Sequence, residues 1–118
     1  MPSATQIETA LVNNNKPIMK ITVSGEIDAS TAILLDTAIL NCKESLNYRV
    51  IFDFNELHYI SSAGLGVFIA HIEDFKANSG DFVMYGLNPN VYSIFDLLGL
   101  KSILHIVENE NEAILFYC

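Results

Sequence analysis

Hydrophobic and polar residues alternate near the start of the chain. In the segment PIMKITVSG (17–25), apolar residues alternate with Lys20 and Thr22, which is the period of a half-buried β-strand. The preceding segment QIETALV (6–12) is joined to it through NNNKP, whose Asn and Pro residues favour a turn. These two segments are therefore predicted to form a β-hairpin.

The spacing of apolar residues then becomes helical. Within residues 28–47, apolar residues recur at steps of three and four, as on one face of an amphipathic helix: Leu35, Ala38 or Ile39, Cys42 and Leu46. The residues that offer N-caps at its start are Asp28, Ser30 and Thr31. The run YRVIFDF (48–54) is short, β-branched and aromatic, which is typical of a central strand covered on both faces. We expect this strand to end at Asp53.

The second half of the chain continues to alternate helix and strand. A helix is predicted after HYIS, with Gly80 as its C-cap and an apolar stripe of Leu65, Phe68, Ile69, Ile72 and Phe75. A strand at 81–87 leads into a helix with Asn88 as N-cap, Pro89 at its first position and Gly99 as its stop. A last strand is predicted at 102–107, and a short helix or turn at 109–118.

These elements predict a single α/β domain over residues 1–118. Their order implies a mixed, mostly parallel sheet of four to five strands with about four helices and an initial β-hairpin. In such sheets, functional sites gather at the carboxyl ends of the strands and at the N-termini of the following helices. Two segments occupy that position here: SGEIDAST (24–31) and HYISSAGLGVF (58–68).

The second of these segments places two glycines at the start of a helix. Ser62 is predicted to be its N-cap, a structural role worth about 1 kcal/mol. Gly64 and Gly66 fall where the first turn is expected, and each glycine costs about 1 kcal/mol relative to alanine. Either another protein approaches this turn closely, or the glycines let the helix pack close to a strand. The sequence leaves both explanations open.

Composition and charge restrict the partners and the compartment. Six Lys and Arg against 14 Asp and Glu give a net charge of −8, which argues against nucleic acid and anionic membranes and permits a basic partner. Cys42 falls in a helical pattern and Cys118 at the end, so no disulfide framework is expected and a reducing cytoplasm is the simplest location. Neither a signal peptide nor an apolar run of about 18 residues is recognisable.

No motif of catalysis or metal binding stands out. ISSAG lacks the glycine that precedes the nucleophile of a serine-hydrolase elbow, and no phosphate loop is present. His58, His71 and His105 are predicted to lie in a surface loop, a helix and a strand, without metal-ligand spacing. Asp53 lacks the acidic pair and lysine of a phospho-aspartate receiver. We therefore expect neither an enzyme nor a bound metal or cofactor.

Three segments resemble hallmarks of STAS domains, the anti-sigma-factor antagonists of bacterial partner-switching modules. DFNELHYISSAGLGVF (53–68) is similar to the family's strand ending in Asp, apolar pair, serine-containing triplet and Gly-Leu-Gly. VSGEIDAST (23–31) is similar to the Gly-Glu-Leu/Ile-Asp loop before the first helix, and NPNVYSIFDLLGLKSILHI (88–106) resembles the third hallmark. The resemblance spans nearly the whole chain and implies the STAS fold.

The resemblance also implies a switch. The family's phosphoacceptor is the serine two residues before the Gly of Gly-Leu-Gly, which is Ser62 here. Ser61 stands where Asp is common and is the second candidate acceptor. The unphosphorylated form would bind an anti-sigma factor that is a serine kinase and so free a sigma factor, and a metal-dependent serine phosphatase would reverse the phosphorylation. The residues expected to contact the partner are Asp28, Ser30, Thr31, Ser61, Ser62, Ala63, Gly64 and Gly66. The alternative is a STAS scaffold without a switch, or one that senses a nucleotide or other ligand.

Overall fold

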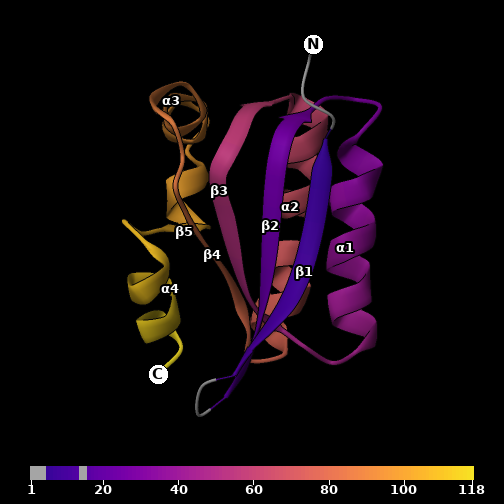
Figure 1. Cartoon of the computed structure of the whole chain (residues 1–118), viewed down its shortest axis with the longest axis vertical. Coiled ribbons are helices and arrows are strands. Elements are labelled where there is room, and N and C mark those ends of the chain that lie inside the picture. The colour runs from indigo at the N-terminus through magenta and orange to yellow at the C-terminus, as the bar shows by residue number, and fades with distance from the viewer. Residues whose placement is uncertain (1–4, 14–15) are drawn as a thin grey trace.

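The computed structural model describes residues 5–13 and 16–118. They contain a five-stranded sheet in the order β1-β2-β3-β4-β5 (Figure 1). Its strands are β1 (Gln6–Asn13), β2 (Pro17–Ile27), β3 (Arg49–Ile60), β4 (Asp81–Tyr85) and β5 (His105–Ile106). β1 pairs antiparallel with β2, and the other pairs are parallel. The predicted hairpin and mostly parallel sheet are confirmed, and residues 14 and 15, which belong to the predicted turn, lie outside the described residues.

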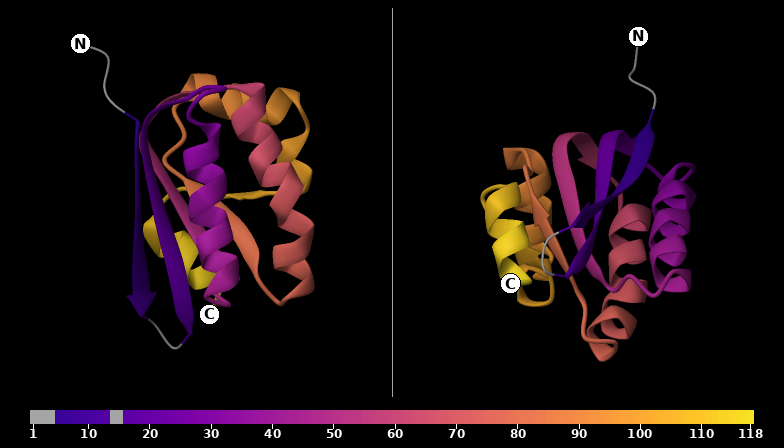
Figure 2. Two further views of the ribbon diagram at one scale, coloured as in Figure 1. Left: turned by 90° about the vertical axis from the view of Figure 1, so that its right-hand side faces the viewer. Right: turned by 60° about the horizontal axis from the view of Figure 1, so that its bottom comes forward.

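Helices cover both faces of this sheet. α1 (Ala32–Glu44) and α2 (Ser62–Ala77) lie side by side on one face (Figure 2). Phe52 of β3 points to that face, and its ring lies 5.1 Å from the ring of Phe68 in α2. The adjacent Ile51 points to the opposite face, where it clusters with Ala113 of α4 (Glu110–Phe116). β3 is therefore a central strand covered on both faces, as predicted.

Two polar anchors hold α4 against the sheet. The Tyr117 hydroxyl accepts the Val50 backbone N–H at 3.1 Å and lies 2.6 Å from the Asp81 carbonyl oxygen, joining β3 and β4. Burial raises the pKa of Tyr117 well above its ordinary value, so this hydroxyl stays protonated. At the other end of α4, Lys20 Nζ donates to the Glu110 carboxylate at 2.6 Å.

β3 is longer than the sequence predicts. It runs to Ile60, so Asp53 lies inside the strand rather than at its end, and His58 is an exposed strand residue rather than a loop residue. The register against β2 shifts twice beyond Thr22, each time with an extra residue in β3. Such bulges interrupt the alternation of buried and exposed residues, which is why NELHYI lacks a strand pattern.

Two further predicted boundaries are wrong. α1 ends at Glu44, and Leu46 is exposed with φ of 60° instead of lying on the buried helical face. α2 ends with Asn78 as its C-cap, so Gly80 does not cap it. A Cβ at Gly80 would run into the carbonyl of Tyr48, and the glycine is required for that close packing.

The segment after β4 forms a helix with the predicted ends. α3 (Pro89–Leu97) begins with Asn88 as N-cap, whose side chain accepts the Val91 N–H at 2.8 Å. Gly99 follows the helix with φ of 71°, a left-handed conformation that favours glycine. The strand predicted at 102–107 contracts to β5, because Leu100–Ser102 form the short 3₁₀ helix η1.

Candidate functional site

The loops after β2 and β3 meet at the carboxyl edge of the sheet, at the top of Figure 1. Ile27 and Ile60, which end these neighbouring strands, are paired in register. The backbone N–H of Ser61 donates to the Ile27 carbonyl oxygen at 2.7 Å. This bond places the Asp28–Thr31 turn beside the start of α2, so the two predicted site segments come together.

Ser61, not Ser62, is the N-cap of α2. Its backbone is extended, and its hydroxyl accepts the Gly64 N–H at 3.4 Å. The predicted cap is therefore wrong by one residue. With two adjacent hydroxyls in the sequence, only the backbone conformation decides which one closes the helix.

Ser62 is the first residue of α2, and its side chain is exposed. Among the described residues, none forms a hydrogen bond with its hydroxyl. The group stands at the N-terminus of a 16-residue helix, where unpaired N–H groups and the helix dipole favour a negative charge. An accessible alcohol in this position can accept a phosphoryl group without any rearrangement of the core.

The Asp28 carboxylate is used within its own turn. One of its oxygens accepts the N–H groups of Ser30 and Thr31 at 2.9 and 3.0 Å and the Ser30 hydroxyl at 2.7 Å. The bonds from Ser30 and Thr31 hold the pKa of Asp28 below its ordinary value. Thr31 occupies the N-cap position of α1, but its side chain does not cap. The Asp28 carboxylate therefore stays ionised at neutral pH. Its hydrogen bonds fix the shape of the loop beside Ser61.

The two glycines of α2 have different roles. A Cβ at Gly64 would lie 2.6 Å from Ile27 Cγ2 and 2.7 Å from Ile60 Cγ1, so this glycine is required where the helix packs on the ends of β2 and β3. At Gly66 a Cβ would meet nothing within 4 Å. Close packing explains Gly64. At the exposed Gly66, by contrast, no side chain projects from α2 beside Ser62.

The exposed face of α2 contains a residue that the spacing of apolar residues predicts to be buried. Ile69 exposes 51% of its surface, so its predicted position in the buried stripe is wrong. It follows Phe68 and is turned about 100° away from it, onto the face of Ser62 and Gly66. Ile33, near the start of α1, is 66% exposed. The steps from Ser62 to Gly66 to Ile69 are helical, and this spacing could have identified the face.

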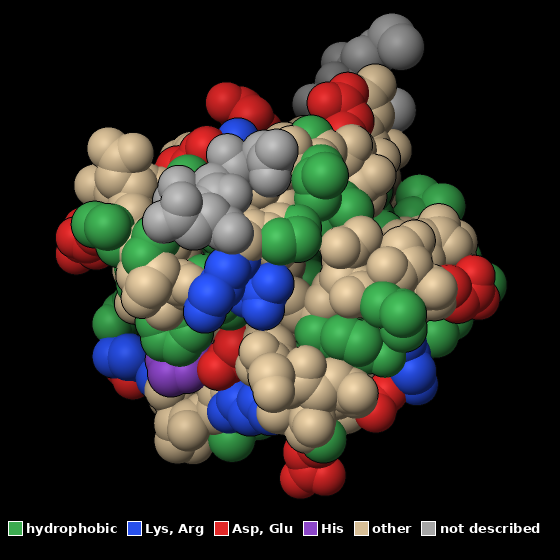
Figure 3. Space-filling view, turned by 90° about the horizontal axis from the view of Figure 1, so that it is seen from below, with side chains coloured by type: hydrophobic (Ala, Val, Ile, Leu, Met, Phe, Trp, Pro, Cys, Tyr) green, Lys and Arg blue, Asp and Glu red, His purple; other side chains and the backbone are tan. Residues whose placement is uncertain are grey.

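Charge is distributed unevenly between the two edges of the sheet. Figure 3 views the face opposite the site, where basic side chains lie among acidic ones. This face contains the amino ends of the parallel strands and the C-terminal ends of α1 and α2. Four of the six basic residues lie there: Lys16 immediately before β2, Arg49 at the start of β3, and Lys43 and Lys76 in the last turns of the two helices. The site edge instead carries the exposed acidic residues Glu26 and Asp28. A partner with basic groups is the better electrostatic match for it.

The three histidines lie on separate elements. His71 Nε2 is 2.6 Å from an Asp36 oxygen and so joins α2 to α1, while His105 Nε2 is 3.2 Å from Asp81. Within residues 5–13 and 16–118, no three His, Cys, Asp or Glu residues gather closely enough to hold a metal ion. No helix in the described part of the chain is long and apolar enough to cross a membrane.

Comparison with known proteins agrees with this geometry. The STAS domain family matches residues 9–113. The chain belongs to the STAS domain family. The match covers the site edge as well as the sheet, so the resemblance found in the sequence is confirmed.

Individual STAS proteins resemble this chain over most of its length. The anti-sigma-B factor antagonist of Listeria monocytogenes is 34% identical over 94 residues, which cover 78% of this chain and 81% of that protein. The crystal structure of an anti-sigma factor antagonist from Mycobacterium paratuberculosis superposes with a TM-score of 0.81 at 23% identity, covering 95% and 94% of the two chains. The structure of the anti-sigma factor antagonist SpoIIAA in its unphosphorylated form superposes with a TM-score of 0.74 at 22% identity, and the match covers 94% of this chain and 93% of that one. The predicted STAS fold is therefore confirmed.

Proposed function

We propose that this STAS protein is an anti-sigma-factor antagonist whose binding is controlled by phosphorylation of Ser62. In its unphosphorylated form it binds an anti-sigma factor that is also a serine kinase, and this binding frees a sigma factor. The observation that carries the proposal is the exposed Ser62 hydroxyl at the N-terminus of α2. Relatives named anti-sigma factor antagonists, and the existence of a phosphorylated form of SpoIIAA, support it.

Phosphorylation has little effect on the folded monomer in this account. A phosphate adds about −1.5 to −2 charges at pH 7. At the start of α2 it meets free N–H groups and the positive end of the dipole, a gain of about 0.3–2 kcal/mol. Neither Asp28–Thr31 nor Ser61–Gly66 contains a basic residue that could pair with it. The phosphate therefore stays on the surface and the fold is retained.

The switch acts at the interface with the partner. A dianion buried against a surface that does not compensate it costs several kcal/mol, and each 1.4 kcal/mol is about tenfold in affinity. This penalty exceeds the small gain in the monomer. Phosphorylation at Ser62 is thus expected to release the partner rather than to unfold the domain.

The partner surface extends from the two loops along α2. Its polar part consists of Asp28, Ser30, Thr31, Ser61 and Ser62, at the edge that carries Glu26. Its apolar part consists of Ala63, Gly66 and Ile69 with Ile33 of α1, all exposed. An apolar strip with a polar rim is typical of protein interfaces. Gly64 supports this surface from below, since it is buried.

The rest of the proposed cycle follows from a reversible serine phosphate. A metal-dependent serine phosphatase removes the phosphate and restores binding, and the chain itself performs no chemistry. These steps place the protein in the cytoplasm, with sigma factor and ATP. No cofactor takes part.

The proposal is tested by the affinity of the cognate anti-sigma factor for charge variants, measured by calorimetry. Ser62→Ala is expected to bind like the wild type, and Ser62→Glu at least about tenfold more weakly, since a buried carboxylate imitates part of the phosphate penalty. Ser45→Glu adds the same charge at the end of α1 and is the control. Wild-type affinity in Ser62→Glu would contradict the switch and favour a scaffold without one.

A further inference from the structure

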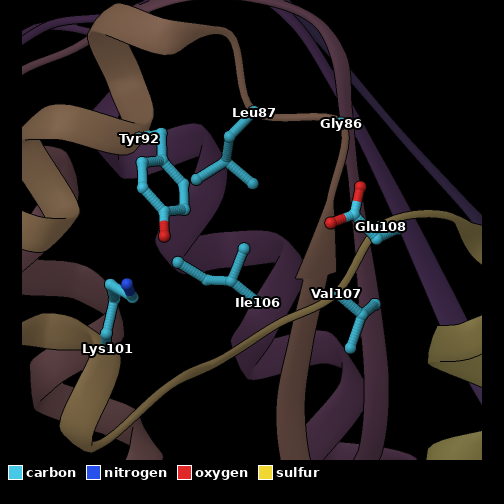
Figure 4. Close-up of a pocket in the computed structure, with 7 residues that line it drawn as sticks. All are labelled: Gly86, Leu87, Tyr92, Lys101, Ile106, Val107 and Glu108. Carbon is cyan, nitrogen blue, oxygen red and sulfur yellow. The ribbon is translucent and has the colours of Figure 1, made fainter.

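A concave site lies between α3, η1 and the ends of β4 and β5. It is a cavity of about 240 Å³ that opens to solvent (Figure 4). Leu87 and Ile106 form its apolar wall. Val107 also lines the cavity, but its side chain packs with the cluster around Ala113 on the other face of the sheet. None of these residues belongs to the proposed partner surface, so the cavity is a separate feature of the molecule.

Groups of opposite charge line this cavity. Tyr92 and Lys101 lie together on one side in Figure 4, and Glu108 lies on the other. Lys101 Nζ is 4.9 Å from the centre of the Tyr92 ring and 3.7 Å from an Asp96 oxygen. The Asp96 side chain is 64% exposed, so this ion pair is weak and readily exchanged. Within the described chain, no basic group forms a salt bridge with Glu108.

One wall of the cavity is already fixed in place. Gly86, which follows β4, has φ of 80°, and a Cβ on it would lie 2.5 Å from the Asn55 side chain of β3. The Asn88 side chain donates to the Leu57 carbonyl at 3.1 Å and ties the same loop to β3. A ligand would therefore enter a largely formed site and would not have to order this loop.

We propose that this cavity binds a small zwitterion whose two charges are separated by a short apolar chain. Its carboxylate lies between Lys101 and the Tyr92 hydroxyl, its ammonium group at Glu108, and its methylene groups on Leu87 and Ile106. The class is that of ω-amino acids. This site is independent of the proposed function.

The charges of the cavity disfavour simpler ligands. A plain anion is repelled by Glu108 and by the net charge of −8, whereas a plain cation pairs with Glu108 but makes no contact of opposite charge with Lys101. Drug-sized ligands occupy pockets of about 300–1,000 Å³, so a cavity of about 240 Å³ suits a short chain better than a nucleotide. A zwitterion satisfies both charged ends and the apolar middle.

The test is a titration of the full chain with ω-aminohexanoate, followed by backbone amide NMR shifts. Hexanoate and hexylamine, which each lack one charge, are matched probes, and γ-aminobutyrate tests the length. We expect saturable shifts confined to residues 86–87, 92, 101 and 106–108 for one of the amino acids. Each singly charged probe should bind at least about tenfold more weakly, because it lacks one charge-assisted contact.

Two variants and their controls test the assignment of the ends. Lys101→Met and Glu108→Gln should each weaken binding about tenfold while the remaining amide shifts stay unchanged, and Lys16→Met and Glu44→Gln, at exposed positions elsewhere, should bind like the wild type. Equal binding of hexanoate, or no saturable shift with either amino acid, would overturn the proposal. The proposal would also be overturned if the control variants Lys16→Met and Glu44→Gln weakened binding as much as Lys101→Met and Glu108→Gln.

Discussion

The backbone N–H of Ser61 donates a hydrogen bond of 2.7 Å to the carbonyl of Ile27. This bond joins the end of β3 to the end of β2, at the point where the polypeptide leaves the sheet after each of these strands. It holds the start of α2 against the loop shaped by Asp28, and it leaves the next side chain, Ser62, pointing away from the core. The accessible hydroxyl is therefore a consequence of how two parallel strands end together.

The adjacent serines are expected to differ in their effect on stability. Ser61→Ala removes the cap of α2 and should lower the free energy of unfolding by about 1 kcal/mol. Ser62→Ala removes an exposed hydroxyl and should change it by less than about 0.5 kcal/mol. Urea denaturation of both variants measures the difference. A larger loss in Ser62→Ala would show that Ser62 is the cap.

The two glycines are expected to respond to alanine with opposite signs. Gly64→Ala forces a methyl group against Ile27 and Ile60 and should destabilise the domain by about 1–3 kcal/mol. Gly66→Ala meets open space inside a helix and should stabilise it by up to about 1 kcal/mol. Thermal or urea unfolding distinguishes the two. Destabilisation by Gly66→Ala would mean that its role is structural.

The anchor of α4 is expected to depend on one hydroxyl. Tyr117→Phe keeps the ring but leaves the Val50 N–H and the Asp81 carbonyl without this partner, which should cost about 1–3 kcal/mol of unfolding free energy. Tyr59→Phe, at a side chain that is 46% exposed, is the control and should change stability by less than about 0.5 kcal/mol. Equal effects of the two variants in urea denaturation would contradict the anchoring role.

Stability at acid pH is expected to depend in part on Glu110. The hydrogen bond from Lys20 lowers the pKa of Glu110 below its ordinary value of 4.5. As the pH falls, Glu110 is protonated in the unfolded chain before it is protonated in the folded one. The stabilisation by the Lys20–Glu110 pair is therefore fully present above pH 4.5 and is lost as the pH falls through the folded-state pKa of Glu110. Solvent screens the pair, and its worth is below about 1 kcal/mol. Glu110→Gln should therefore lose less stability than the wild type between neutral and acid pH. Identical pH profiles in urea denaturation would contradict this assignment.

Much of the fold could be predicted from the sequence because its signals are local. Alternation in β2, helical spacing in α1 and the Asn88-Pro89 start of α3 are each visible within a few residues. The boundaries that failed depend on contacts between distant segments. β3 continues past Asp53 because bulges let it remain paired with β2, and Gly80 is required by the distant Tyr48 carbonyl.

The two predicted site segments meet at the carboxyl edge of the sheet, but the predicted start of α2 is wrong by one residue. The spacing of SSAGLG indicates a helix start at a strand end, yet which hydroxyl caps it depends on the bond from Ser61 to Ile27. Ile69 fits an apolar stripe by residue type, and only the direction from which the sheet covers α2 shows that it is exposed. The cavity at Lys101 and Glu108 joins segments from several elements, so no local motif predicts it.

The residue that carries the phosphate after reaction with the cognate kinase decides whether Ser62 is the switch. The chain, Ser61→Ala and Ser62→Ala are each incubated with the anti-sigma factor and ATP, and the modified residue is identified by mass spectrometry of peptides. One phosphate on residue 62 of the wild type and of Ser61→Ala, and none on Ser62→Ala, is the predicted result. Equal labelling of Ser62→Ala at any other residue would contradict the assignment of the switch.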